Sequence, residues 1–113
     1  MTVTADRAAS QAATSEILER SLDSSVLTLR LNRPRAGNSL SLPMIAALQA
    51  ALDAAAVDDA VHVIVLEAAG GKVFCAGHDL GEVRERNSPA FAKEMASRCS
   101  RMMQTIVNHP RPV

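Results

Sequence analysis

The sequence predicts an α/β fold in which strands and helices follow one another within one domain. Residues 61–68 (VHVIVLEA) are apolar on both faces, which is typical of a central parallel strand. A helical apolar stripe precedes this segment and a second one follows it. Because a strand, a helix and a strand come in succession, the connection between them is expected to be a right-handed crossover.

The ordered part of the chain is expected to begin near Glu16 with a β-hairpin. Apolar and polar residues roughly alternate in 17–22, and three leucines share one face of 26–31 (VLTLRL). We predict two half-buried strands joined across Asp23 and Ser24.

The segment NRPRAGN (32–38) interrupts this alternation and is predicted to be a loop. Pro34 keeps Arg33 extended. Gly37 and Asn38 tolerate a positive φ, as turns often require.

Two helices are predicted on either side of the apolar strand. Ser41 is expected to cap the first, with Pro43 in its first turn. The second is expected to start at Ser88 and to end at Asn108, where His109 and Pro110 follow. Each has an apolar stripe, so one face of each is expected to be buried: Met44, Ile45, Leu48, Ala51, Leu52 and Ala55 in the first, Phe91, Met95, Met102, Met103 and Ile106 in the second.

Residues 1–15 are small and polar and are expected to form a disordered tail. A mitochondrial transit peptide would normally contain more arginine and no acidic residue.

The strand at 61–68 needs neighbours on both edges, and the hairpin supplies only some of them. Val113 resembles the first residue of a further strand. We therefore expect 16–113 to be the N-terminal half of a domain that residues absent here complete.

The composition disfavours several classes of protein. The chain has 12 basic and 12 acidic residues among 113, so it lacks the basic surface of a nucleic-acid binder. With 2% aromatic residues it offers no base-stacking platform. No apolar run approaches the roughly 18 residues of a membrane-spanning helix. Cys75 and Cys99 are expected to be free thiols, which favours the cytoplasm, with the mitochondrial matrix as the alternative.

The stretch KVFCAGHDL (72–80) places a thiol, an imidazole and a carboxylate within five positions. We expect no metal site, because the adjacent His78 and Asp79 would diverge and no CxxC or HxxxH companion is present. A nucleophilic Cys75 would need a base within reach and a lowered pKa. Its place beside Phe74, at the edge of an apolar segment, favours an inert packed thiol.

The backbone of this stretch offers another interpretation. Gly77 permits a sharp turn. Asp79 followed by Glu82 resembles a capping box, so a short helix is expected from Leu80. The N–H groups that enter a helix are unpaired, and a turn of this kind can direct the N–H of His78 into a cleft that holds a developing oxyanion.

Three stretches resemble, in consistent order and spacing, the enoyl-CoA hydratase/isomerase (crotonase) superfamily: LRLNRPRAGNSLSLPMIAAL, VHVIVLEAAGGKVFCAGHDL and NHPRPV. The resemblance runs from about Glu16 to Val113. It implies a crotonase-like ββα spiral, of which the chain is the N-terminal portion, assembled into trimers or hexamers. It also implies an acyl-CoA substrate, with coenzyme A as part of the substrate and no separate cofactor.

The same resemblance implies roles for individual residues. The main-chain N–H of His78 matches the first donor to the thioester oxygen, while the second donor and the catalytic glutamates lie beyond Val113. Arg33 and Arg35 fall where relatives place basic residues near the CoA phosphates, and plain solvation is an equal expectation. The positions matched to substrate binding are Arg33, Arg35, Ala36, Ala76, Gly77, His78, Asp79 and Leu80.

His78 stands where hydratases usually have alanine, and this G-H-D pattern, with CSRMMQTIVNHPRPV, resembles the subgroup of enoyl-CoA hydratase domain-containing protein 3. The leading hypothesis is an enzyme of fatty acid metabolism that hydrates 2-enoyl-CoA in its full-length form. The alternatives are isomerisation, thioester hydrolysis, or a non-catalytic CoA-binding or assembly module. Glu67, Glu82 and Glu85 are expected to be solvated or capping residues, so the 113-residue chain alone is expected to be inactive.

Overall fold

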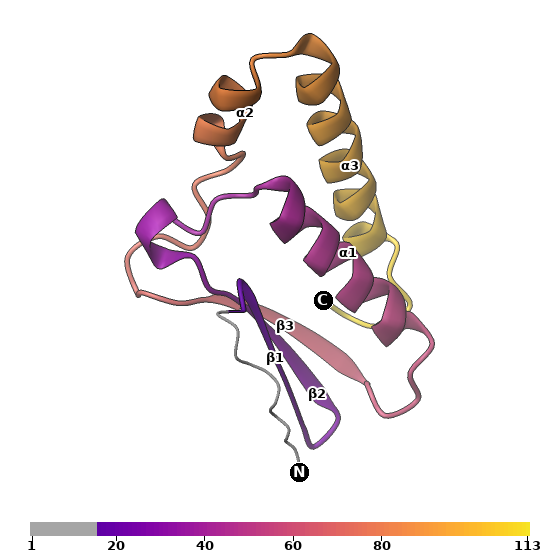
Figure 1. The fold of residues 1–113 in the computed structure, drawn as a ribbon. Coiled ribbons are helices and arrows are strands. Elements are labelled where there is room, and N and C mark those ends of the chain that lie inside the picture. The colour runs from indigo at the N-terminus through magenta and orange to yellow at the C-terminus, as the bar shows by residue number, and fades with distance from the viewer. Residues whose placement is uncertain (1–15) are drawn as a thin grey trace.

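The computed structural model describes residues 16–113, and the tail predicted for 1–15 lies outside them. Figure 1 shows α1 between the strands and α3. No helix in the described part of the chain is long and apolar enough to cross a membrane. The elements, in order, are β1 (Leu18–Asp23), β2 (Val26–Leu31), the short 3-10 helix η1 (Pro34–Ala36), α1 (Leu42–Ala56), β3 (Val63–Ala68), α2 (Leu80–Arg86) and α3 (Pro89–Val107).

The three strands form one sheet in the order β1-β2-β3. β1 and β2 are antiparallel, and β2 and β3 are parallel. The predicted α/β class and the crossover through α1 are therefore confirmed. The hairpin turns at Ser24 and Ser25, one residue later than predicted, and both have a positive φ (52° and 67°). Two-residue hairpin loops favour this conformation because its twist matches that of the strands.

The prediction of two half-buried strands holds for β2 but is wrong for β1. Leu27, Leu29 and Leu31 of β2 point into the core and are at most 4% exposed. In β1 only Leu18 is half-buried, and Leu22 is 40% exposed. β1 is an outer strand of the sheet, and both of its faces are largely exposed to solvent within residues 16–113.

β3 lies at the edge of the sheet within residues 16–113. The expectation of a central strand depends on neighbours outside these residues and stays a prediction. β3 begins at Val63, pairs only with β2, and leaves Val65 41% exposed. On its other edge the Ile64 N–H donates to Pro112 O at 2.9 Å. The C-terminal residues thus begin to cover this edge with one backbone hydrogen bond.

The core lies between the sheet and the two long helices. The predicted caps are confirmed, since Ser41 accepts the N–H of Met44 and Ser88 accepts the N–H of Phe91. One prediction in α3 is wrong, because Met103 is 46% exposed and Cys99 is buried in its place. The buried apolar residues of the two helices are Met44, Ile45, Leu48, Leu52, Ala55, Phe91, Met95, Cys99 and Met102.

Candidate functional site

Two loops meet at one end of the sheet, and the predicted site lies where they touch. The first loop (32–41) follows β2, and the second loop (69–79) follows β3. Ala76 N–H donates to Gly37 O at 2.9 Å. Leu40 and His78 then form a parallel bridge, in which Leu40 N–H donates to Gly77 O at 2.7 Å.

This bridge determines how the His78 peptide is directed. Leu40 O accepts the Asp79 N–H at 2.9 Å, so Leu40 bonds to the residues on both sides of His78. In parallel pairing the residue between two such partners directs its own N–H to the opposite side. Within residues 16–113 no acceptor bonds to the His78 N–H. Gly77 has a φ of +97°, which confirms the predicted sharp turn.

The capping box predicted around Asp79 is half formed. Asp79 Oδ1 accepts the Glu82 N–H at 3.1 Å and caps α2 as expected. The reciprocal bond from the Glu82 side chain to the Asp79 N–H is absent, because Leu40 O already accepts that N–H. Glu82 Oε1 instead accepts the Leu42 N–H at 3.0 Å. Glu82 therefore connects α2 to the start of α1.

Arg33 lies inside the junction of the two loops. Its Nη2 is 3.1 Å from Asp79 Oδ2, and the two side chains are 23% and 19% exposed. Its Nη1 donates to Ser39 O at 2.9 Å. The Glu82 N–H bond lowers the pKa of Asp79, and the bond and charge of Arg33 lower it further, against the opposing effect of burial. The guanidinium thus has internal partners, and its contact with a CoA phosphate stays a prediction.

Asn38 joins the same two loops, a role that the sequence interpretation missed. Its side chain is buried, and Oδ1 accepts the Arg33 N–H at 2.8 Å. Nδ2 donates to Ala69 O at 3.0 Å and to Val73 O at 2.9 Å. The predicted positive φ of Asn38 is confirmed at 53°. Its sequence signals were its tolerance of a positive φ and its place in the stretch LNRPRAGNSL of the resemblance, and neither indicated a contact with the second loop.

A hollow of about 430 Å³ lies between the loops. Of the predicted substrate-binding residues, only Arg35 lines it, and Lys72 adds a second cation that the sequence interpretation missed. Ala36, Ala76, His78 and Leu80 are exposed outside this lining, while Gly77 and Asp79 are half-buried. The complete lining is Pro34, Arg35, Gly37, Asn38, Ala69, Gly70, Lys72 and Val73.

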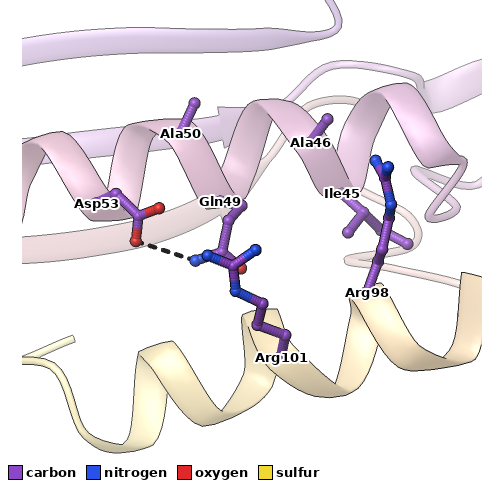
Figure 2. Close-up of a pocket in the computed structure, with 7 residues that line it drawn as sticks. All are labelled: Ile45, Ala46, Gln49, Ala50, Asp53, Arg98 and Arg101. Atoms are coloured by element: carbon purple, nitrogen blue, oxygen red, sulfur yellow. Dashed lines mark hydrogen bonds between the residues drawn. The ribbon is translucent and has the colours of Figure 1, made fainter.

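A second groove, of about 370 Å³, lies between α1 and α3 and contains no predicted site residue. Figure 2 shows Gln49 and Asp53 of α1 facing Arg101 of α3 across it. Gln49 Nε2 donates to Asp53 Oδ1 and to Thr105 Oγ1, each at 3.0 Å. The first bond lies within α1, and the bond to Thr105 connects α1 to α3.

The remaining reactive side chains lie in structural positions. Cys75 is half-buried and packs against the core. Cys99 is buried, and burial raises the pKa of its thiol, with a smaller contribution from nearby Cys75. Residues 16–113 contain no group of three His, Cys, Asp or Glu side chains arranged to hold a metal ion. Glu67 is 3.4 Å from Arg30 in an exposed ion pair.

Comparison with known proteins gives a consistent family. The family model described as enoyl-CoA hydratase/isomerase matches residues 26–113. Human enoyl-CoA hydratase domain-containing protein 3, named as mitochondrial, is 37% identical over 94 residues. That match covers 83% of this chain and 30% of the human protein. Trans-2-decenoyl-[acyl-carrier-protein] isomerase of Streptococcus mutans is 40% identical over 63 residues, covering 56% of this chain and 24% of the isomerase.

The solved structures agree with the sequence relatives. The crystal structure of an enoyl-CoA hydratase from Mycobacterium smegmatis superposes with a TM-score of 0.82 at 43% identity. The superposition covers 87% of this chain and 38% of the hydratase. This chain therefore belongs to the enoyl-CoA hydratase/isomerase family, and its fold is a part of the crotonase fold.

Proposed function

We propose that this chain contributes part of an acyl-CoA site in which the His78 N–H polarises the thioester carbonyl. The His78 peptide is the observation that carries the proposal. Hydrogen bonds with Leu40 hold the residues on both sides of His78, and the His78 N–H has no acceptor within residues 16–113. An N–H that is fixed and unpaired can bind a partly negative oxygen without first breaking a protein hydrogen bond. Family membership supports a CoA thioester as the substrate class.

The hollow between the loops supports a place for the charged part of coenzyme A. Arg35 and Lys72 line it, and two cations suit phosphate groups. The exposed Ala36, Ala76 and Leu80 leave the surrounding surface open to the ligand. Coenzyme A is part of the substrate in this proposal, and no further cofactor is required.

The proposed reaction of the complete protein is the hydration of 2-enoyl-CoA. We do not assign that chemistry to Glu67 or Glu82, because Glu67 pairs with Arg30 and Glu82 bonds to the start of α1. Glu85 is an exposed residue of α2. Isomerisation is an alternative reaction, because one of the relatives is an isomerase. Thioester hydrolysis, or CoA binding without catalysis, would use the same N–H.

A binding experiment tests the proposal on the 113-residue chain. Butyryl-CoA, which has no double bond to hydrate, and free CoA are titrated separately against ¹⁵N-labelled protein. We expect both ligands to bind and only butyryl-CoA to shift the His78 amide resonance, because only the thioester offers a carbonyl oxygen. Binding without that selective shift, or no binding at all, would contradict the proposal. Turnover of crotonyl-CoA by this chain would contradict the expected inactivity.

The assembly and location of the protein are further parts of the proposal. We propose a homotrimer or hexamer, as the resemblance implies, acting in fatty acid metabolism. The mitochondrial name of the human relative supports the matrix as the location over the cytoplasm. Fractionation of cells that produce the natural protein would distinguish the two compartments.

A further inference from the structure

The family resemblance implies a position near the CoA phosphates for Arg33, yet its guanidinium is held by the protein itself. Nη1 donates to Ser39 O at 2.9 Å, and Nη2 is 3.1 Å from Asp79 Oδ2. The two charged side chains are half-buried. A pair at this depth is screened less by water and salt than a surface pair. A phosphate would therefore compete with Asp79 for the charge of this guanidinium and with Ser39 for its Nη1 donors.

The ion pair lies directly beside the His78 peptide. Asp79 follows His78 in the chain, and its N–H donates to Leu40 O. Gly77 precedes His78, and its O accepts the Leu40 N–H. Arg33 therefore connects the first loop to the second at the residue next to the peptide that directs the free N–H.

The backbone of Arg33 is fixed as well. Its N–H donates to Asn38 Oδ1, while Asn38 Nδ2 bonds to Ala69 O and Val73 O in the second loop. A buried carboxamide that makes all three bonds resists rotation, since any rotation would leave buried polar groups unpaired. The guanidinium therefore reaches Asp79 from a loop that is itself tied to the second loop.

We propose that Arg33 and Asp79 are a positioning pair that holds the His78 peptide in the direction required for binding an oxygen, and that Arg33 is not a phosphate ligand. The assignment of that oxygen to a thioester rests on the proposed function. The geometric claim concerns the protein without ligand and is tested separately.

The first test is amide hydrogen exchange of the ligand-free chain with the variants Arg33→Gln and Asp79→Asn. Asparagine keeps an oxygen that can cap α2 but loses the charge that attracts Arg33. We expect the amides of residues 40 and 79 to exchange about tenfold faster in either variant, because one charge-assisted hydrogen bond is lost. The double variant should exchange no faster than the single variants, since both residues act through one contact.

A core variant provides the matched control. Leu52 is fully buried in α1, and Leu52→Ala should destabilise the whole domain by creating a cavity. Its amides should exchange faster throughout, without a preference for residues 40 and 79. If Arg33→Gln and Asp79→Asn give only this general acceleration, or additive effects, the positioning pair is refuted.

The second test separates positioning from phosphate binding. We expect Arg35→Gln to weaken CoA binding, and Arg33→Gln to leave CoA affinity unchanged while reducing the His78 shift caused by butyryl-CoA. A loss of CoA affinity in Arg33→Gln with unchanged exchange at residues 40 and 79 would identify a phosphate ligand and overturn the inference. If the unmodified chain binds no acyl-CoA, only the proposed function fails. The exchange pattern still shows whether Arg33 and Asp79 hold the His78 peptide.

Discussion

At the scale of single residues, His78 separates a backbone function from a side-chain function. Its side chain is exposed, and the N–H that we assign to the thioester belongs to the main chain. We therefore expect His78→Ala to keep CoA affinity within about threefold, a small free-energy difference. The same variant should change the preference among acyl chain lengths, because the exposed ring belongs to the same residue as the N–H that we assign to the thioester. Calorimetric titration with CoA and with acyl-CoA series measures both effects, and a large loss of CoA affinity would contradict this assignment.

Gly77 gives a prediction about the backbone alone. Its φ is +97°, and a Cβ built on it would meet no atom within 4 Å. Space therefore does not limit substitution, but a β-branched residue resists positive φ. We expect Gly77→Val to destabilise the fold by roughly 1–3 kcal/mol, the usual cost of a residue held in such a conformation. Butyryl-CoA should no longer shift the His78 amide in this variant. Urea denaturation and the NMR titration measure these two effects.

Gly71 offers the control for this prediction. It also has a positive φ, with open space around its Cβ position, but it lies away from His78 in the sequence. Gly71→Val should lower stability to a similar extent and leave the acyl-CoA shift intact. Equal loss of the shift in both variants would mean that general destabilisation, and not the turn at Gly77, removes binding.

At the scale of elements, local signals predicted most of the structure. Ser41, Asp79 and Ser88 each cap a helix within three residues of their own position, so a single sequence reveals them. The hairpin turn was misplaced by one residue because Ser24 and Ser25 adopt a positive φ without the usual Gly or Asn signal.

Contacts between distant segments could not be predicted from the sequence. The partners of Glu82 and of Arg33 lie 40 and 46 residues away, in Leu42 and Asp79. Composition and spacing carry no signal for such a pairing. The sequence therefore predicted the turn at Gly77 and the cap of α2 at Asp79 correctly. It missed the side chains that hold the two loops together.

The start of α2 gives a pH prediction. The pKa of Asp79 is lowered from 3.8 by the Glu82 N–H bond and by Arg33. A carboxylate with a lower pKa in the folded state stabilises the fold above its unfolded pKa and loses that contribution as the pH falls through the folded pKa. We expect the stability advantage over Asp79→Asn to be complete near pH 6 and to decrease as the pH falls below about 4 and through the lowered folded pKa.

Urea denaturation between these pH values measures that advantage. Arg33→Gln should reduce it, because one cause of the lowered pKa is removed. An advantage that does not change with pH would show that the Asp79 charge does not contribute to folding.

At the scale of the whole molecule, the C-terminal segment (109–113) is hydrogen-bonded both to α1 and the residues after it and to the sheet. His109 Nε2 is 2.8 Å from Leu52 O, and Arg111 Nη2 donates to Asp58 O at 3.1 Å. The Ile64 N–H bond to Pro112 O then attaches the segment to β3. The chain thus places its last residues against the sheet edge, while the two loops and the His78 peptide lie at the far end of β3.

The open edge of β3 leads to a prediction about association. Within residues 16–113 no strand pairs with this edge, and Val65 of β3 is 41% exposed. Val57 and Val107, at the ends of α1 and α3, are more than 80% exposed. Exposed edges and apolar side chains favour association between chains.

We therefore expect the average mass of the 113-residue chain to rise with concentration in sedimentation equilibrium. Val65→Lys should reduce that rise, because an inserted charge opposes edge pairing. Arg84, an exposed residue of α2, provides the control, since Arg84→Lys should leave association unchanged. A chain that stays monomeric at every concentration would show that its edge is already protected.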